Sequence, residues 1–324
     1  WSQRWDPGIT PRSSSRAVAA AAPGDKILVG PGRYGDLDAD GTFGEAGEEA
    51  GVNAVVTIDK AVVVESLEGA ATTLIDGGNA ALHGVVVAAP GARFGKAKKG
   101  FTIARAGRAG VLVDPAASGV TVSGIRAVRN ETGFASKASG LTIRGNVADA
   151  NAESGFNFTG SGLVVIGCRA TGNGGSGFAI AGNGNVLKGD VASANGADGF
   201  VFGEGDGHVL TGSVAAGNAT GLRVSSNGIT AAGNSFVGNA DEGVAVTAPN
   251  ITLRKSNVFG NGAVGGTNCG VATFGAGSVT LDGICFGAST GPGADPADDV
   301  CGGNAVTVLE VTEKVIKVAP KVPL

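Results

Sequence analysis

Hydrophobic and polar positions repeat through the middle of this chain with a period close to 22 residues. Each unit opens on a small residue and a short alternating apolar run, as in GVTVSGIRAVRN (119–130) and GLVVIGCRATGN (162–173). Each unit closes on asparagine, and these residues are Asn130, Asn151, Asn173, Asn195, Asn218, Asn239 and Asn261. Such self-similarity at a fixed period predicts a solenoid in which each unit forms one coil.

A second column of apolar residues keeps the same period and predicts a stacked core. It consists of Phe134, Phe156, Phe178, Phe200, Leu222 and Val244. A leucine-rich repeat needs several leucines per unit, whereas most of these units have one or none. Alternating Val, Ile and Thr are instead typical of strands with one buried face. We therefore expect an all-β fold, a parallel β-helix with about 22 residues per coil.

The asparagine column predicts a hydrogen-bonded ladder at one corner of the coils. Stacked side-chain amides can bond to the coils on either side and satisfy polar groups inside a dry stack. Asparagine also tolerates the left-handed backbone conformation that a tight corner demands. We expect a structural role for this ladder and for the phenylalanine column.

The start of the chain predicts a cover for the open end of the solenoid. Residues 13–22 form a candidate helix with serine at its start and Pro23-Gly24 after it, and residues 26–29 form the first strand. This helix followed by PGDKILVGPGRY resembles the start of the right-handed parallel β-helix, or pectin-lyase-like, superfamily and its bacterial repeat proteins. The resemblance spans roughly residues 13–310. It implies a right-handed fold with an N-terminal capping helix, but not an activity, because the scaffold carries lyases, hydrolases, epimerases, adhesins and inert proteins.

The four cysteines predict a disulfide in an exported protein. They are Cys168, Cys269, Cys285 and Cys301, and they include no C-x-x-C pair of the kind that binds metal. The stretch CFGASTGPGADPADDVC (285–301) resembles a closing segment of bacterial members, although Cys285 stands where an aromatic residue is expected. The resemblance implies a Cys269–Cys301 disulfide, with Cys285–Cys301 as the rival pairing. Cys168 is expected to remain a thiol.

Composition and charge exclude several classes of partner. The 324 residues include 59 glycines and 11 prolines, a low-complexity level were the glycines not periodic. The net charge of −4 argues against nucleic acid and anionic membranes as general partners. No apolar run is long enough to span a bilayer. We expect a secreted or cell-surface protein, and a removed signal peptide would explain the tryptophan at position 1.

The chain divides into three expected parts. Residues 1–12 form an N-terminal extension, residues 13–303 the capped β-helix, and residues 304–324 a C-terminal strand and tail. Both end segments carry large apolar side chains, so they either fold back on their own chain or dock on a neighbouring copy. Docking of this kind would give head-to-tail filaments.

One acidic loop predicts a calcium site. In DLDADGTFGEAGEE (36–49), Asp36, Asp38 and Asp40 alternate and precede a glycine, as in calcium loops. Glu45 and Glu48 flank position 47, where an EF-hand would require glutamate and this chain has glycine. We expect an irregular calcium site, and the alternative is a solvated acidic loop.

Catalytic residues are harder to find in the repeat. Arg144, Lys188 and Arg254 share one column, but Ile166, Thr211 and Ala232 interrupt it. The acids Glu131, Glu153, Asp198 and Asp241 follow the asparagine corner, away from that column, and no carboxylate pair has catalytic spacing.

One polar patch interrupts an apolar column. It consists of Asn185, Glu204, Asp206 and His208. It is a site, a buried hydrogen-bonded pair, or a local shift of register.

Three functions fit these observations. The first is a non-catalytic extracellular scaffold that self-assembles into filaments, and it is favoured by the absence of a catalytic constellation. The second is a calcium-dependent polysaccharide lyase or epimerase, and the third is a carbohydrate-binding adhesin. Exposed tryptophan or tyrosine, the usual sugar platform, is scarce in the repeat.

Overall fold

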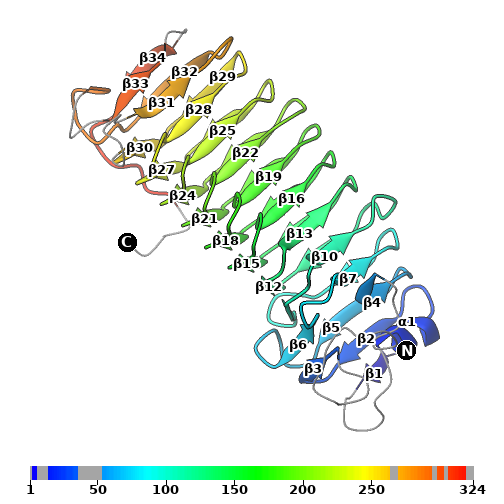
Figure 1. Cartoon of the computed structure of the whole chain (residues 1–324). Coiled ribbons are helices and arrows are strands. Elements are labelled where there is room, and N and C mark those ends of the chain that lie inside the picture. The colour runs from blue at the N-terminus through cyan, green and yellow to red at the C-terminus, as the bar shows by residue number, and fades with distance from the viewer. Residues whose placement is uncertain are drawn as a thin grey trace. The chain divides into compact units, whose positions relative to one another are not determined.

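The chain is a right-handed parallel β-helix with one short N-terminal helix, as the sequence predicted. The computed structural model describes residues 2–5, 14–35, 53–262, 269–293, 298–302 and 306–318. Two compact units divide the chain, Trp1–Leu163 and Val164–Leu324, and each is a stack of coils built from three parallel sheets, here called A, B and C (Figure 1). The described residues contain no helix long and apolar enough to cross a bilayer.

Unit 1 has five or six strands in each sheet. Sheet A runs β1 (Ser2–Trp5), β2 (Lys26–Val29), β5 (Val63–Ser66), β8 (Arg93–Phe94), β11 (Thr121–Ser123) and β14 (Thr142–Arg144). Sheet B runs β3 (Gly32–Tyr34), β6 (Thr73–Asp76), β9 (Thr102–Ala104), β12 (Arg126–Val128) and β15 (Val147–Asp149). Sheet C runs β4 (Ala54–Ile58), β7 (His83–Val87), β10 (Ala109–Val113), β13 (Thr132–Ser136) and β16 (Phe156–Phe158).

Unit 2 repeats this arrangement. Sheet A runs β17 (Val164–Ile166), β20 (Val186–Lys188), β23 (Val209–Thr211), β26 (Thr230–Ala232), β29 (Ile251–Arg254), β32 (Val279–Ile284) and β34 (Val306–Val311). Sheet B runs β18 (Arg169–Thr171), β21 (Val191–Ser193), β24 (Val214–Ala216), β27 (Ser235–Val237) and β30 (Asn257–Phe259). Sheet C runs β19 (Phe178–Ile180), β22 (Phe200–Phe202), β25 (Leu222–Val224), β28 (Val244–Val246), β31 (Cys269–Thr273) and β33 (Asp299–Cys301).

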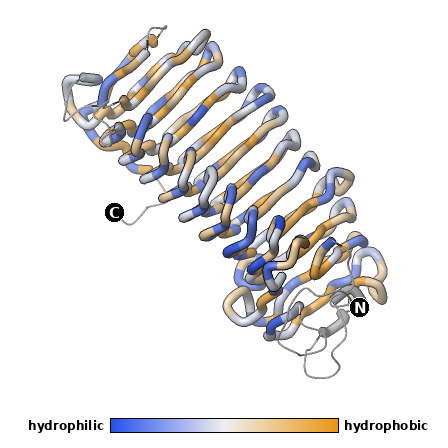
Figure 2. Tube along the Cα trace, viewed as in Figure 1, coloured by the Kyte–Doolittle hydropathy of each residue, from blue (hydrophilic) through white to orange (hydrophobic). Residues whose placement is uncertain are grey.

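The core of each unit is a set of stacked apolar columns. Hydrophobic and hydrophilic residues alternate along the coils, so one face of each strand turns inward (Figure 2). The rings of Phe134 and Phe156 lie 4.7 Å apart and within 6° of parallel, and those of Phe178 and Phe200 lie 4.9 Å apart. The predicted phenylalanine column is therefore confirmed within each unit.

The asparagine ladder is also confirmed. Asn195 donates its side-chain amide to Asn218 Oδ1 over 2.8 Å and to the carbonyl of Ala170 over 3.2 Å, and its own Oδ1 accepts from Asn173. All seven ladder asparagines are nearly fully buried. The Asn195 amide thus bonds to the coil before it and to the coil after it.

The backbone conformation at this corner differs from the prediction. The left-handed residue is the one before each asparagine, including Arg129, Ala150, Gly172, Ala194 and Gly217. No ladder asparagine has a positive φ. The turn is made one residue earlier, which lets the asparagine point its amide inward along the stack.

A second polar ladder lies at another corner of unit 2. The Cys168 amide donates to Asp190 Oδ1 over 2.7 Å, the Asp190 amide to Ser213, and the Ser213 amide to Asn234. The Asn234 amide donates to Ser256 in turn. Burial raises the pKa of the Asp190 carboxyl well above its ordinary value.

The helix α1 (Ser14–Ala20) covers the first coils of unit 1, as predicted. It lies against β4 and β1 and buries Val18. Lys60 donates from Nζ to the carbonyls of Ala19 and Ala21, at the end of the helix where carbonyls lack helical partners.

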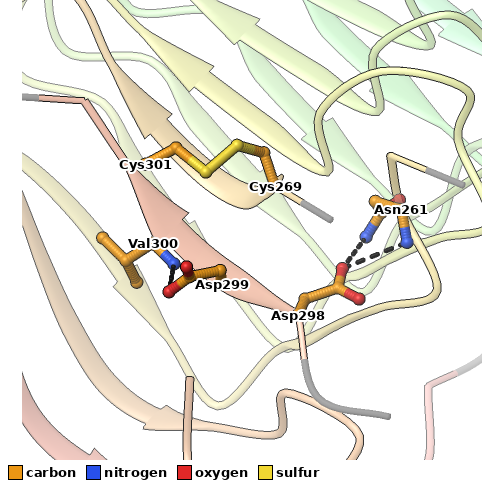
Figure 3. Close-up of a disulfide and its surroundings, with 6 residues drawn as sticks. All are labelled: Asn261, Cys269, Asp298, Asp299, Val300 and Cys301. Atoms are coloured by element: carbon orange, nitrogen blue, oxygen red, sulfur yellow. Dashed lines mark hydrogen bonds between the residues drawn. A yellow bond between two sulfur atoms is a disulfide. The ribbon is translucent and has the colours of Figure 1, made fainter. Parts of the chain in front are cut away.

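The C-terminal end of unit 2 is closed by a disulfide and a buried acid. Cys269 and Cys301 are bonded, with their Cα atoms 5.8 Å apart, which confirms the expected pairing over its rival. Cys168 and Cys285 are buried outside this disulfide. Figure 3 shows Asp298, just before β33, accepting hydrogen bonds from Asn261, so the ladder continues one step beyond its last asparagine.

Candidate functional site

The predicted polar patch is divided between the interior and the surface. Asn185 and His208 are fully buried, whereas Glu204 and Asp206 are exposed. The His208 ring packs 5.0 Å from that of Phe202. Burial lowers the pKa of His208 more than the Glu204 backbone and the Asp206 carboxylate raise it. The four residues therefore do not line one surface, and the buried pair belongs to the core of unit 2.

The predicted calcium ligands Asp36, Asp38, Asp40, Glu45 and Glu48 lie outside the described residues. Calcium binding in this loop therefore stays a prediction. Among the residues that are described, no three His, Cys, Asp or Glu side chains come together as a metal site.

The interrupted basic column lies on the outer face of sheet A. Ser123 pairs with Arg144 in unit 1, and the column Ile166, Lys188, Thr211, Ala232 and Arg254 runs through unit 2. Arg254 lies 3.6 Å from Asp282 in the next coil. In unit 2, Lys188 and Arg254 are thus separated by two coils that have an uncharged residue at this position. The cations of the column form no continuous track.

A basic groove lies on the outer face of sheet A in unit 1, where sequence reasoning placed no site. It has a volume of about 240 Å³ and spans β5, β8 and β11. Arg93 and Lys96 supply positive charge and are exposed, while Thr121 and Ser123 supply hydroxyl groups. The groove therefore combines cations that attract an anion with neutral groups that can hydrogen-bond to hydroxyls.

A buried carboxylate forms part of the groove lining. Glu65 on β5 is 5% exposed, and Lys26 Nζ on the preceding strand lies 2.8 Å from its Oε2. The ion pair offsets the charge of Glu65. The groove that a ligand would meet therefore has a net positive charge, which comes from Arg93 and Lys96.

Two other charged clusters on the described surface are internally satisfied. In unit 1, Arg33 and Arg105 both bond to Asp76. Burial opposes ionisation of Asp76, but the hydrogen bonds from Arg105, Gly78 and Arg33 hold the pKa of its carboxyl below the usual range. In unit 2, Arg223 makes a two-point contact with Asp198 at 2.9 and 3.0 Å. Paired in this way, these charges stabilise the coils and offer little to a ligand.

Two of the three comparisons with known proteins find similar proteins. A family model described as "Periplasmic copper-binding protein (NosD)" matches residues 96–272. The comparison with curated proteins gives no match.

Solved structures with the same architecture are distant in sequence. The A-module of Azotobacter vinelandii mannuronan C-5 epimerase AlgE6 is similar at 18% identity and a TM-score of 0.63, over 93% of this chain and 93% of that one. The A-module of AlgE4 from the same organism is similar at 15% identity and a TM-score of 0.60, over 93% and 94%. Pectate lyase Pel9A is similar at 18% identity and a TM-score of 0.54, over 96% and 78%. Likeness at these identities shows the fold alone.

The donor set of this chain does not fit copper. Copper sites in proteins draw on cysteine, methionine and histidine, but the chain has no methionine, two histidines and four cysteines, two of them in the disulfide. His83 belongs to unit 1, whereas Cys168, His208 and Cys285 belong to unit 2. Cys168 and Cys285 lie at the same corner but five coils apart, about 24 Å at the spacing of parallel strands.

Proposed function

The chain belongs to the family of periplasmic copper-binding proteins (NosD), and from this premise we propose that it is an extracytoplasmic β-helix that binds an acidic polysaccharide without turnover. The family supports a location outside the cytoplasm. We also propose that the protein is secreted or displayed at the cell surface. Copper has no part in it, because the donor set does not fit the metal.

The observation that carries the proposal is the groove of unit 1. Its cations face solvent, and no described carboxylate makes an ion pair with Arg93 or Lys96. Uronate carboxylates would bind to these side chains, and the hydroxyls of Thr121 and Ser123 would meet sugar hydroxyls. A polysaccharide with repeated carboxylates can contact both cations, and several weak contacts made at once raise its affinity.

The fold relatives support the ligand class by analogy only. Two are named as epimerases of mannuronan and one as a pectate lyase, and these names describe those proteins. The scarcity of exposed tryptophan and tyrosine in this chain favours recognition by charge over recognition by stacking.

A lyase or epimerase activity is the second candidate, and the placement of Arg93 and Lys96 in one groove favours it. Removing a proton next to a uronate carboxylate needs a base and a group that stabilises the resulting negative charge. Lys96 would serve as the base and Arg93 would stabilise the charge. A lyase would then release unsaturated sugars that absorb in the ultraviolet from pectate or alginate, whereas an epimerase would return the proton to the opposite face and change only the configuration at C5; we expect neither product.

Self-association through the termini also belongs to the proposal. β34 is the last strand of sheet A in the described part of unit 2, and its Leu309 side chain is 65% exposed. An edge strand with apolar side chains is suited to pairing with another chain. Electron microscopy of the purified full chain tests for filaments.

The experiment that tests the proposed binding is affinity electrophoresis of the full chain. Gels that contain polygalacturonate or alginate should retard the protein, and gels that contain neutral dextran should not. Equal mobility in all gels at low salt would contradict the proposal.

A further inference from the structure

One loop of unit 2 brings glycines, carboxylates and a buried histidine together in consecutive positions. It is the run GEGDGH (203–208), which connects β22 of sheet C to β23 of sheet A. Glu204 and Asp206 are exposed, whereas His208 is fully buried. The titratable groups of this loop therefore lie on both sides of the boundary between core and solvent.

His208 occupies a core position that the following coils fill with aliphatic side chains. The strand register aligns it with Ile229 and Ile251 in the next two coils. Its ring packs against that of Phe202, and neither ring nitrogen has a hydrogen-bond partner among the described residues. The imidazole therefore suits the core only in its neutral form, because an unpaired buried charge is costly.

The carboxylates that could pair with a protonated His208 belong to its own loop. The uncharged residues at the same corner of the two flanking coils are Asn183, Asn185, Ser226 and Asn227. Glu204 and Asp206 are thus the acids next to the ring, and both side chains reach solvent. Burial lowers the pKa of His208, and the Asp206 carboxylate opposes this shift without cancelling it.

The loop is loosely joined to the coil that follows it. The contact is an isolated bridge between Asp206 and Asn227, with backbone hydrogen bonds of 3.2 and 3.3 Å. Gly205 and Gly207 have φ of 105° and 67°, a region that glycine enters and leaves freely. Long hydrogen bonds and alternate glycines let the loop separate from this coil at low cost.

We propose that residues 203–208 form an acid-triggered switch, in which protonated His208 leaves the core of unit 2 and pairs with Glu204 and Asp206 at the surface. The corner between β22 and β23 opens as the ring withdraws from Phe202, and it closes when the proton is lost. Exposure of this corner would then depend on the pH of the medium. This proposal concerns unit 2 and stands apart from polysaccharide binding.

Hydrogen exchange of the full chain, followed by mass spectrometry as the pH is lowered, tests the inference. In the open loop the histidine is free to take up a proton, so opening should become about tenfold more favourable for each pH unit below about 6.5. The increase ends at the pH where the buried form of His208 itself becomes protonated. The protection of residues 203–209, expressed relative to the exchange rate of an unstructured chain at the same pH, should fall accordingly.

Three variants identify the groups that respond. His208→Leu should abolish the fall in protection, and leucine suits a position that the next two coils fill with isoleucine. Glu204→Gln/Asp206→Asn removes the partners of the open state and should make the fall smaller. His83→Gln is the matched control, because it removes the other histidine of the chain, in unit 1, and should leave the fall unchanged.

Two exchange results would overturn the proposal. One is protection of residues 203–209 that does not change with pH. The other is an equal fall in His208→Leu, which would assign the response to acid to another group.

Nuclear magnetic resonance of the unmodified protein gives a second measurement that does not depend on the folding of a variant. The ring signals of His208 and Phe202 should shift together as the pH falls, because the two rings separate. Titration of His208 while the Phe202 signals stay fixed would show that the ring remains in place, and would also overturn the switch.

Discussion

The side-chain amide of Asn261 donates a hydrogen bond of 2.8 Å to the carboxylate of Asp298, across 37 residues of sequence. Asp298 also accepts from the backbone amides of Asn261 and Gly260, at 3.1 and 2.7 Å. It therefore replaces the asparagine that the next coil would have supplied. β33, which begins one residue later, is bonded to β31 by the disulfide, so the closing acid and the disulfide hold the same end of unit 2 (Figure 3).

Replacing this acid should destabilise the end of the ladder. Asp298→Ala removes the acceptor of two buried Asn261 donors and of the Gly260 amide, and should lower the free energy of unfolding by about 2–3 kcal/mol. Urea denaturation measures the change. Asp299→Ala is the matched control, because Asp299 is exposed and its carboxylate accepts from the adjacent Val300 amide. Equal losses for the two variants would show that Asp298 does not close the ladder.

The left-handed corner residue offers a pair of opposite substitutions. Ala194 and Gly217 precede ladder asparagines in successive coils, with φ of 52° and 67°. Ala194→Gly should stabilise the protein by about 0.5–1 kcal/mol, because glycine avoids the cost of this conformation at some cost in chain entropy. Gly217→Ala should destabilise it by a similar amount. Thermal unfolding measures both, and a shift of the same sign for both variants would refute the corner assignment.

Asp190 should make stability depend on pH. Its pKa is raised in the folded state by burial, so its contribution to stability is complete below the pKa of the unfolded chain and is lost as pH rises through the folded pKa. Asp190→Asn removes this loss. The variant should therefore gain stability over the unmodified protein as pH rises from about 4, the ordinary range of aspartate.

Denaturation at several pH values measures this difference. The asparagine should fit the site, because Asn234 holds the same corner two coils later and donates to the Leu210 carbonyl over 2.9 Å. A difference that does not change with pH would contradict the raised pKa.

Calcium binding by the acidic loop 36–49 can be tested without its structure. Chelator should lower the melting temperature, and added calcium should restore it by mass action. The combined change of Asp36, Asp38 and Asp40 to asparagine should abolish the response. A response that survives the triple change would place the calcium elsewhere in the chain.

The repeat made the fold predictable from sequence. Because coils of 21 to 23 residues stack in register, one column of asparagines and one of phenylalanines identify the solenoid and its buried corner. The local conformation at the corner was predicted at the wrong residue. The asparagine is the residue that repeats in the sequence, but the left-handed conformation is adopted one position earlier. That position is glycine in some coils and alanine in others, as at Gly172, Ala194 and Gly217.

The candidate site escaped prediction because its coils are irregular. Val63 pairs with Arg93 and Arg93 with Thr121, so these coils are 30 and 28 residues long and do not align with the later repeat. Glu65 and Arg93 are therefore neighbours that no fixed period brings together. The run KAKKG (96–100) was the one available signal of a basic surface.

The contact made by the C-terminal segment escaped prediction for a different reason. Of the strand and tail expected in residues 304–324, the described part contains the strand Val306–Val311. The chain then leaves the sheet and crosses to Asn257. Nothing in the sequence of either segment indicates that contact, because it joins a side-chain amide to backbone groups.

Calorimetric titration of the full chain with an oligogalacturonate tests the proposed function most directly. The unmodified protein should bind at low salt and weaken as salt rises, since the groove recognises charge. The double variant Arg93→Ala/Lys96→Ala should lose affinity about tenfold or more. The matched double variant Arg108→Ala/Lys137→Ala, which removes two exposed cations beside sheet C of the same unit, should bind as before. Equal affinity for the two double variants would contradict the account.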